Sequence, residues 1–241
     1  MHYVGVDGCG VGWIAVFGEG PHLAYALFGS IQDIAQAFPN AKMICVDIPI
    51  GLPWSEHPVR ACDRLARVAL GRNRQSSVFP VPCRRAVHAG TPLEAREANQ
   101  ADLNRSLSAQ ALGIRPKIAE VDAFLGGDLR ARSVFLEVHP EVCFWGLAGR
   151  SPMAQAKKSA GGAADRLKLL KSYAPDVHQL LDKVSGEHPR RDVCPDDVLD
   201  ATVALLTARA PKSAIHRMCG NLTVDQIGLP IEMLYAVPYE R

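Results

Sequence analysis

Apolar residues gather in three short segments near the start of the chain, over residues 3–7, 11–17 and 22–28. Each segment has the length and the branched or aromatic character of a strand. The breaks between them are short and contain glycine, which favours tight turns between antiparallel strands. The pattern therefore predicts an antiparallel meander of three strands.

A helix and an interior strand are predicted next. Residues 31–38 have a helical pattern, and the hydroxyl of Ser30 is suited to cap its first turn. Residues 42–47 form a short, mainly apolar run, which is typical of a strand inside a sheet. A helix between two strands indicates a crossover, so the fourth strand should be parallel to the first or the third. The sheet is therefore expected to be mixed.

The composition changes after residue 51, where prolines and arginines become frequent. Helices are predicted over residues 59–70, 91–111 and 116–125, the second from a threonine cap followed by proline and glutamate. We interpret residues 52–130, approximately, as a mainly helical insertion. With no linker-like boundary around it, the insertion belongs to one predicted domain over residues 1–241.

A fifth strand and further helices follow the insertion. Residues 133–139 read as the strand, and residues 142–148 as a short helix. Two more helices are predicted over 163–171 and 176–184, and residues 231–237 read as a final edge strand or an extended cover. Together the elements predict an α/β fold in which helices flank a mixed five-stranded sheet, with the insertion between strands four and five.

Residues 194–211 predict a helix that is apolar nearly all round, which indicates burial. Pro195 suits its first position, and Pro211 lies just past its end. A stripe of small side chains indicates close packing against a sheet: Ala201, Ala204 and Ala208. Asp200 lies in the second turn, where a preference for the helix start does not account for it. Because burying an unpaired carboxylate is costly, we expect Asp200 to be paired or to bind a metal ion.

Two more acids, Asp196 and Asp197, lie in the first turn of this helix. The positive end of the helix dipole favours carboxylates there, which is a sufficient explanation for Asp196. Asp197 has the same explanation, but it also lies three residues before Asp200 and on the same helix face. Both roles are therefore kept open for Asp197.

Two of the predicted strands end in an aspartate, Asp7 and Asp47. Aspartate is a common turn residue, so either one alone has an ordinary explanation. If the two strands are parallel neighbours, however, both carboxylates lie at the edge where open α/β sheets bind ligands. Glu137 near the end of the fifth strand is either a solvated acid or a further carboxylate at this edge. His139 is more often a structural hydrogen-bonding residue than a catalyst.

Carboxylates that converge from distant stretches repel one another unless cations lie between them. Ligand sets made only of oxygen suit Mg²⁺ or Mn²⁺. Two such ions, about 3.5–4 Å apart, stabilise the attacking and leaving oxygens of a phosphoryl displacement in which water is the nucleophile. The predicted catalytic residues are Asp7, Asp47, Asp197 and Asp200, which are also predicted metal ligands together with Glu137.

The overall composition narrows the class of protein. A hydrophobic content of 48% and a charged content of 22% are typical of soluble globular proteins. The net charge of +2 excludes a global attraction to polyanions, so any nucleic-acid surface must be local. The seven cysteines form no Cys-x-x-Cys pair, which indicates reduced thiols in a cytoplasmic protein. With no signal peptide and no apolar run of roughly 18 residues, no membrane partner is expected.

Several segments together resemble known families. The Asp-x-x-Asp-Ala pattern of residues 197–201 resembles a helix of the Holliday-junction resolvases, in the ribonuclease H superfamily. More closely, the chain resembles domain of unknown function 429, a microbial family of predicted nucleases. The segments that carry the closer resemblance are residues 4–13, 47–53, 60–67, 76–84, 137–141, 157–158 and 196–201.

The resemblance implies a ribonuclease H-like sheet with a helical insertion. It implies that Asp7 and Asp200 are direct metal ligands, that Asp47 takes the place of an acid found in many superfamily members, and that Asp197 binds metal or positions water. Basic residues are expected to contact phosphates of a nucleic acid, although any single one is more often part of a solvated surface. They are Arg72, Arg74, Arg84, Arg85, Lys157 and Lys158.

Three functions remain open. The first is a nuclease that requires Mg²⁺ or Mn²⁺ and cleaves DNA or RNA. The second is a nucleotide-phosphate enzyme resembling actin-like ATPases and sugar kinases, with Gly161 and Gly162 before a helix as an anion site. A length of 241 residues is short for the two lobes of such enzymes. The third is a non-catalytic module that binds a partner. The substrate and the oligomeric state stay open.

Overall fold

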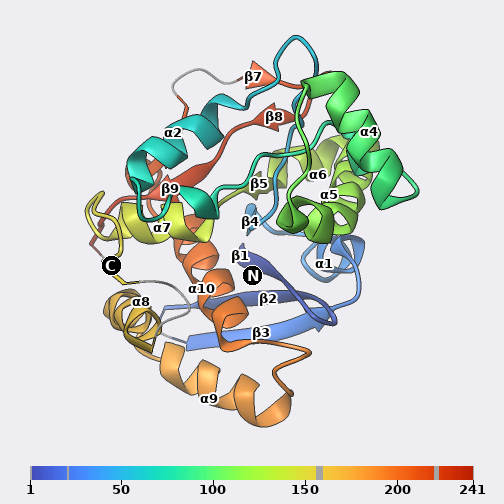
Figure 1. The fold of residues 1–241 in the computed structure, drawn as a ribbon. Coiled ribbons are helices and arrows are strands. Elements are labelled where there is room, and N and C mark those ends of the chain that lie inside the picture. Colours follow the sequence, from blue (N-terminus) through green and yellow to red (C-terminus); the bar gives the residue numbers. More distant parts are fainter. Residues whose placement is uncertain (1, 21, 156–159, 220–222, 241) are drawn as a thin grey trace.

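The predicted mixed sheet is confirmed by the computed structural model, which describes residues 2–20, 22–155, 160–219 and 223–240. Its five strands lie in the order β3-β2-β1-β4-β5, as the ribonuclease H-like resemblance implies. Helices cover both faces of the sheet (Figure 1). The strands are β1 (Tyr3–Cys9), β2 (Gly12–Glu19), β3 (His22–Phe28), β4 (Met43–Val46) and β5 (Phe135–Glu137).

The strand directions match the predicted meander and crossover. β1 is antiparallel to β2, which is antiparallel to β3. β4 is parallel to β1, with Val6 opposite Val46, and β5 is parallel to β4, with Glu137 opposite Val46. Of the two alternatives for the fourth strand, pairing with the first is therefore correct. The carboxyl ends of β1, β4 and β5 consequently lie at one edge of the sheet.

The crossover between β3 and β4 is the helix α1 (Ile31–Ala37). Its predicted cap is confirmed, because Ser30 Oγ accepts a hydrogen bond from the Asp33 amide and Asp33 Oδ2 accepts one from the Ser30 amide. Ile31 and Ile34 on its inner side are fully buried. With this apolar side α1 packs on the face of the sheet that also carries Val4 and Val6.

The region between β4 and β5 is mainly helical, as predicted. It contains α2 (Ala61–Leu70), a short 3-10 helix (Gln75–Ser77), α3 (Arg84–Val87), α4 (Pro92–Leu103), α5 (Ala109–Gly127) and α6 (Leu129–Val134). Figure 1 shows these helices, in cyan to light green, above the sheet. Residues of the insertion line a cavity together with Asp47, directly after β4.

Three predicted boundaries in this region were wrong. The helix expected through residue 111 ends at Leu103, because Asn104 adopts a left-handed conformation with φ of 51°. The next helix begins after Ser108, whose hydroxyl caps it, and not at Pro116. Pro116 lies inside α5 with its ring exposed, and the helix continues through it although proline removes one backbone hydrogen bond. The fifth strand is shorter than predicted because α6 extends to Val134.

The remaining helices surround the second face of the sheet. They are α7 (Pro140–Leu147), α8 (Ala160–Tyr173), α9 (Val177–Glu187) and α10 (Pro195–Arg209). Every residue of α10 from Val198 to Ala208 is buried, which confirms the predicted burial. α10 lies against β1, with β2 and β4 on either side. It is the central helix of this face.

The end of the chain forms an extended cover and does not extend the main sheet. β9 (Leu234–Ala236) pairs with β6 (Ile215–Arg217), and β8 (Pro230–Ile231) pairs with β7 (Thr223–Val224). A single parallel bridge joins Leu234 to Val138, just past β5. Of the two predictions for this segment, the extended cover is therefore the one that the structure shows.

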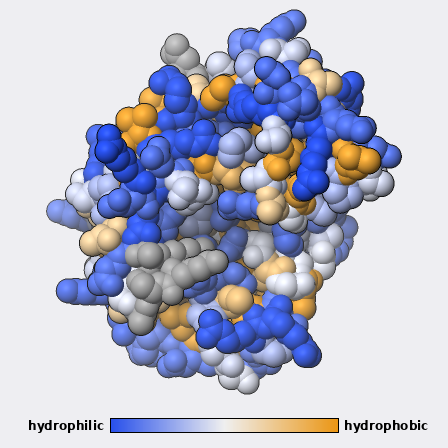
Figure 2. Space-filling view, in the orientation of Figure 1, coloured by the Kyte–Doolittle hydropathy of each residue, from blue (hydrophilic) through white to orange (hydrophobic). Residues whose placement is uncertain are grey.

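All seven cysteines are free thiols, as predicted. Of the described helices, none combines the length and the hydropathy needed to traverse a bilayer. On the face shown in Figure 2, hydrophilic residues predominate and apolar residues occur in scattered patches.

Candidate metal centre

The parallel pairing of β1 and β4 brings Asp7 and Asp47 together. Val6 and Val46 are partners in the register, so the two aspartates are the next residues on neighbouring strands. The Asp47 amide donates to Val6 O at 2.9 Å, which continues the pairing past the end of β4. Side chains alternate along strands, and both aspartates follow a valine of the opposite face. Both carboxylates therefore lie on the face that α10 covers.

Gly5 allows α10 to deliver Asp200 to the same place. A Cβ atom at Gly5 would lie 2.1 Å from both Ala201 O and Leu205 N, so only glycine permits this approach of helix and strand. Gly5 lies two residues before Asp7 and faces the same side of the sheet. Because Asp200 immediately precedes Ala201, the close contact brings its carboxylate to the end of β1. The predicted packing of the small residues of α10 against a sheet is confirmed.

Asp7, Asp47 and Asp200 form a group that we call the aspartate cluster. One oxygen from each lies within 4.8 Å of the other two. Asp7 and Asp200 are 8% and 2% exposed, whereas Asp47 is half-buried. Asp7 Oδ1 also accepts a hydrogen bond from the Gly8 amide at 2.7 Å. Three carboxylates in this arrangement offer the hard oxygen donors that Mg²⁺ and Mn²⁺ prefer.

Asp197 lies at the start of α10 and outside this group. Its Oδ2 accepts a hydrogen bond from the Cys194 amide at 2.8 Å, and the Cys194 side chain bonds to the Asp197 amide in return. This is the reciprocal pairing of a capping box, with cysteine in the place of serine or threonine. Asp197 thus has the helix-start role that was one of its two predicted roles. Asp196 is half-buried in the same turn.

Glu137 lies in a second group, with Asp63 and Cys62. Arg60 contacts both of its carboxylates. We call Arg60, Asp63 and Glu137 the arginine cluster. Arg60 is 2% exposed and donates to Glu137 Oε2, which also accepts from the Ile50 amide at 2.6 Å. Arg60 Nη1 lies 3.7 Å from Asp63. A guanidinium thus supplies the positive charge here, and the structure places Glu137 with it and apart from the aspartate cluster.

Burial shapes the protonation of the arginine cluster. Burial raises the pKa of Glu137 to about 8, and the nearby Arg60 opposes that rise. Burial by itself lowers the pKa of Arg60, but Asp63 and Glu137 raise it well above its usual value. Arg60 therefore keeps its positive charge, and its contacts with Glu137 and Asp63 depend on that charge.

A cavity of about 500 Å³ opens beside the aspartate cluster. Asp47 and Asp200 form part of its wall, and His139, Pro140 and Glu141 form another part. The helical insertion contributes the rest through Asn73, Arg74, Ser76, Ser77 and Gln110. Segments from three regions of the chain therefore enclose the space in front of the carboxylates.

The predicted phosphate-binding residues are dispersed. Arg74 lines this cavity, and its Nε donates to Met153 O at 3.3 Å. Arg72 is exposed on the same loop. Arg85 is paired with Asp102 at 2.7 Å. Lys157 and Lys158 lie outside the described residues. Arg74 is thus the described basic residue of this set that the structure brings to the carboxylates.

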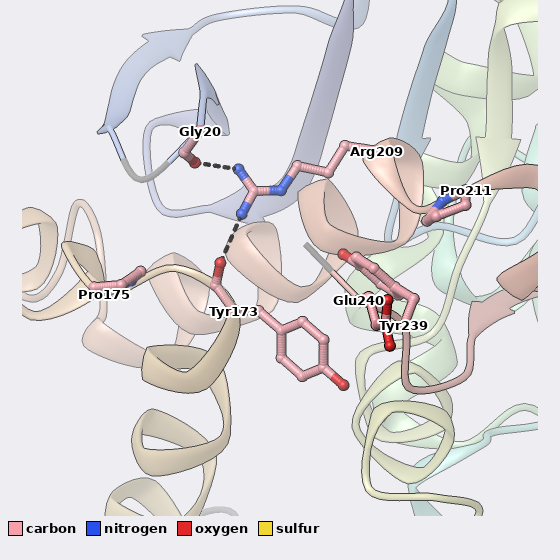
Figure 3. Close-up of a pocket in the computed structure, with 7 residues that line it drawn as sticks. All are labelled: Gly20, Tyr173, Pro175, Arg209, Pro211, Tyr239 and Glu240. Carbon is pink, nitrogen blue, oxygen red and sulfur yellow. Dashed lines mark hydrogen bonds between the residues drawn. The ribbon is translucent and has the colours of Figure 1, made fainter.

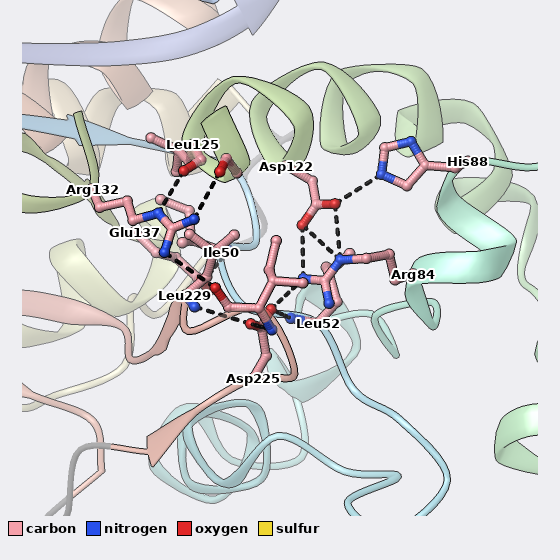
Figure 4. A network of polar contacts seen from close by, with 12 residues as sticks. Ile50, Leu52, Arg84, His88, Asp122, Leu125, Arg132, Glu137, Asp225 and Leu229 are labelled. Atoms are coloured by element: carbon pink, nitrogen blue, oxygen red, sulfur yellow. Dashed lines mark hydrogen bonds and ion pairs between the residues drawn. The ribbon is translucent and has the colours of Figure 1, made fainter. Parts of the chain in front are cut away.

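Arg84 belongs to a structural network (Figure 4). Its Nε donates to both oxygens of Asp122, at 3.0 and 3.2 Å, and its Nη2 reaches Asp225. His88 lies 2.8 Å from Asp122. Burial by itself lowers the pKa of Arg84, but its bonds to the two aspartates raise it. The network joins α3 and α5 to the turn before β8, and it engages most of the hydrogen-bonding capacity of Arg84.

Lys117 is a cation near the site that the sequence pattern did not single out. From α5 its Nζ donates to Gly12 O and lies 4.4 Å above the Trp13 ring. The same Nζ would lie 3.7 Å from a Cβ atom at Gly8, the residue after Asp7. Lys117 follows Gln110 by seven residues, a helical spacing that puts both on the side of α5 facing the strand ends. The seven-residue spacing from Gln110 to Lys117 is the sequence signal that could have identified Lys117.

A different pocket lies at the other end of α10 (Figure 3). Its volume is about 450 Å³, and Tyr173 and Tyr239 contribute to its wall. Arg209 lies there, about 14 Å along the helix from Asp200 at roughly 1.5 Å per residue. The guanidinium of Arg209 donates to Gly20 O at 2.9 Å and to Tyr173 O at 3.1 Å, so it joins segments of the backbone. This pocket includes no member of the aspartate cluster.

Comparison with known proteins identifies a family. The family model described as "Protein of unknown function (DUF429)" matches residues 5–219. The chain belongs to the DUF429 family. No curated protein and no solved structure gave a significant match. The resemblance to domain of unknown function 429 is therefore confirmed, and the chemistry of the aspartate cluster is the basis for proposing an activity.

Proposed function

We propose that this DUF429 protein is a divalent-metal-dependent hydrolase of phosphodiester bonds, a nuclease that acts on DNA or RNA. The observation that carries the proposal is the aspartate cluster, in which Asp7, Asp47 and Asp200 come within 4.8 Å of one another at the ligand-binding edge of the sheet. Acids so close and so buried are strongly stabilised by a divalent cation.

The chemistry divides between the ion and the protein. Asp7, Asp47 and Asp200 would hold Mg²⁺ or Mn²⁺, which supplies Lewis-acid polarisation of a phosphoryl oxygen when bound. The carboxylates would fix the position of that ion relative to the cavity. Arg74, on the wall formed by the insertion, is placed to bind a neighbouring phosphate. Water is the nucleophile, so the mechanism requires no covalent protein intermediate. A second ion would need donors beyond these three residues.

Nucleic acid is the proposed partner, on the basis of local charge. The net charge of +2 gives no general attraction to polyanions. Arg74 borders the cavity, whereas Lys117 lies beside the end of β1 on the face that carries α5. Arg74 is therefore the cation proposed to bind a phosphate that flanks the cleaved bond.

The alternatives have weaker support. Among the described residues the structure contains one five-stranded sheet, whereas an enzyme resembling actin or the sugar kinases needs two such lobes. A binding module has no use for three carboxylates in close approach, two of them buried, because like charges so close cost stability. Neither alternative has an observation comparable to the aspartate cluster in its favour.

The decisive experiment is calorimetric titration of Mn²⁺ and Mg²⁺ into the wild type and the Asp7→Asn/Asp200→Asn double variant. We expect the wild type to bind and the double variant to lose binding. The matched control is Asp196→Asn, which removes a half-buried acid of the same helix outside the cluster and should bind as the wild type does. With Mn²⁺ present, the wild type is then tested on single-stranded and duplex DNA and RNA.

Cleavage of at least one of these substrates is expected, with a loss of about 1,000-fold or more in the double variant because charge stabilisation of the transition state is removed. Equal cleavage by the wild type and the double variant would exclude the proposed site. Binding of Mn²⁺ with no cleavage of any nucleic acid would exclude the proposed substrate class.

A further inference from the structure

Glu141 is a buried acid that stands near the aspartate cluster without belonging to it. It is the second residue of α7, directly after β5, and it is 6% exposed. It lines the cavity of about 500 Å³ that Asp47 and Asp200 also line. It lies in the first turn of α7, at the positive end of the helix dipole.

One oxygen of Glu141 is held by a buried cation. Arg166 from α8 is 1% exposed, and its Nη2 donates to Glu141 Oε1. The guanidinium is itself fixed, because Nη1 donates to Gly162 O at 3.0 Å and the group lies 5.4 Å from the ring of Phe144. The orientation of the Glu141 carboxylate is therefore set by contacts on the side away from the cavity.

The other oxygen is available. Within the described part of the chain, Glu141 Oε2 is buried and accepts no hydrogen bond. Other buried acids are better satisfied: Asp225 accepts from the amides of Leu52, Ile227 and Leu229 as well as from Arg84. Because an acceptor buried without a donor is costly, Oε2 indicates a group that enters the cavity and donates to it.

His139, on the same cavity wall, also has a buried atom without a hydrogen-bond partner among the described residues. This atom is Nδ1, while Nε2 lies 3.3 Å from Ser77 O. Burial lowers the pKa of His139, so the ring is neutral near pH 7. With the ring hydrogen on Nε2, toward the Ser77 carbonyl, Nδ1 is an acceptor. Two acceptors on one cavity wall fit a molecule that donates hydrogen bonds, such as water.

The distance from the aspartate cluster favours water over direct metal ligation. Glu141 is not among the acids whose oxygens all come within 4.8 Å of one another. Oxygens that share one Mg²⁺ lie about 2.0–2.1 Å from it and hence within roughly 4.2 Å of each other. An acid beyond that range would reach such an ion only through a water molecule, by a hydrogen bond of about 2.7 Å.

We propose that Glu141 is a catalytic residue whose Oε2 accepts the proton of the attacking water, and that Arg166 positions its carboxylate. The inference rests on the proposed hydrolysis of phosphodiesters. In the step, the water oxygen forms a bond to phosphorus and the water proton moves to Glu141. The bond from phosphorus to the leaving oxygen breaks, and that oxygen takes a proton from solvent. Glu141 then releases its proton to solvent, which restores the carboxylate.

The test compares the wild type with Glu141→Gln in two measurements. Mn²⁺ titration should give the same stoichiometry and an affinity within about tenfold, since Glu141 contacts the ion only through water. Hydrolysis of bis(4-nitrophenyl) phosphate with saturating Mn²⁺ should fall by about 100-fold or more, the usual contribution of a general base. The matched control is Glu232→Gln, a glutamate 4% exposed and paired with Arg217, which should match the wild type in both.

Each other outcome overturns the inference in a distinct way. Loss of Mn²⁺ binding in Glu141→Gln would make Glu141 a direct ligand. Hydrolysis within threefold of the wild type would make it structural. If Glu141→Gln does not fold, Glu141→Asp keeps the charge near Arg166 and withdraws the oxygen, and hydrolysis should still fall at least tenfold with Mn²⁺ bound. A wild type that binds no Mn²⁺, or binds it and does not hydrolyse the ester, overturns the proposed function and this inference together.

Discussion

Two groups of acids lie at the same edge of the sheet and differ in the residues that compose them. In the arginine cluster, the guanidinium of Arg60 lies within ion-pair distance of both Glu137 and Asp63. In the aspartate cluster, Asp7, Asp47 and Asp200 bring three carboxylates within 4.8 Å of one another. The first group has the composition of a structural ion pair, and the second has that of a metal site.

The two groups are neighbours, so their location at this edge of the sheet does not explain why their residues differ. Asp47 and Glu137 end adjacent parallel strands, and both line a small cavity of about 90 Å³ together with Arg60. Both groups are also largely buried. The arginine cluster contains Arg60 from the insertion, and the aspartate cluster offers three carboxylate oxygens within 4.8 Å of one another. Location at the carboxyl edge of a sheet is therefore weaker support for a functional acid than the identity of its neighbours.

The largest expected effect comes from removing the cation of the arginine cluster. Arg60→Met should lower the free energy of unfolding by about 3–5 kcal/mol, because it leaves Glu137 and Asp63 buried without their partner. Urea denaturation measures the change. Arg85→Met is the control: Arg85 is largely exposed in its pair with Asp102, and its loss should cost less than about 1 kcal/mol. A loss at Arg60 as small as that at Arg85 would contradict the distinction between the clusters.

The next largest expected effect is the gain in stability on addition of Mn²⁺, which should depend on the aspartate cluster and not on the arginine cluster. With Mn²⁺ at about one hundred times its dissociation constant, the folded wild type should gain about 2.7 kcal/mol, because the ion binds only the folded state. Asp200→Asn should abolish this gain. Glu137→Gln should retain it, even though its starting stability is lower, because Glu137 lies outside the aspartate cluster. Thermal unfolding with and without Mn²⁺ measures both gains, and loss of the gain in Glu137→Gln would show that Glu137 belongs to the metal site.

The smallest expected effect concerns His139, which lies between the two groups. Burial lowers its pKa, so below about pH 6.5 the unfolded chain binds a proton that the folded protein does not. Stability is therefore complete above that pH and falls as the pH decreases. Between pH 7.5 and 5.5 the wild type should lose up to about 1.4 kcal/mol more than His139→Asn. Equal losses, measured by urea denaturation at both pH values, would show that His139 is accessible to protons when folded.

Local signals in the sequence were reliable where neighbouring residues decide the structure. The meander followed from short glycine turns, and the start of α1 from Ser30 and Asp33. The end of α4 and the course of α5 were predicted less well. Ser108 caps α5, whereas the sequence pattern predicted a helix start at Pro116. The buried residues of α5, among them Ile118 and Val121, hold the helix in place through the proline.

The candidate site was predictable only where local sequence signals place its residues. Asp7 and Asp47 end strands, and parallel pairing places such residues side by side, so their meeting followed from the pattern. Asp200 followed from its place in an apolar helix. The roles of Glu141 and Lys117 did not, because each depends on a cavity or a strand end formed by segments far away in the chain.

The sequence by itself determined the sheet, its central helix and the edge at which acids gather, since these depend on periodicity and on turn and cap residues. Only the tertiary structure decided which acids share a cation. Glu137 meets Arg60, which is 77 residues away in the chain, and Asp197 turns to the helix start while Asp200 turns to β1. The reason is physical: charge balance is set by neighbours in space, and the chain order does not specify those neighbours.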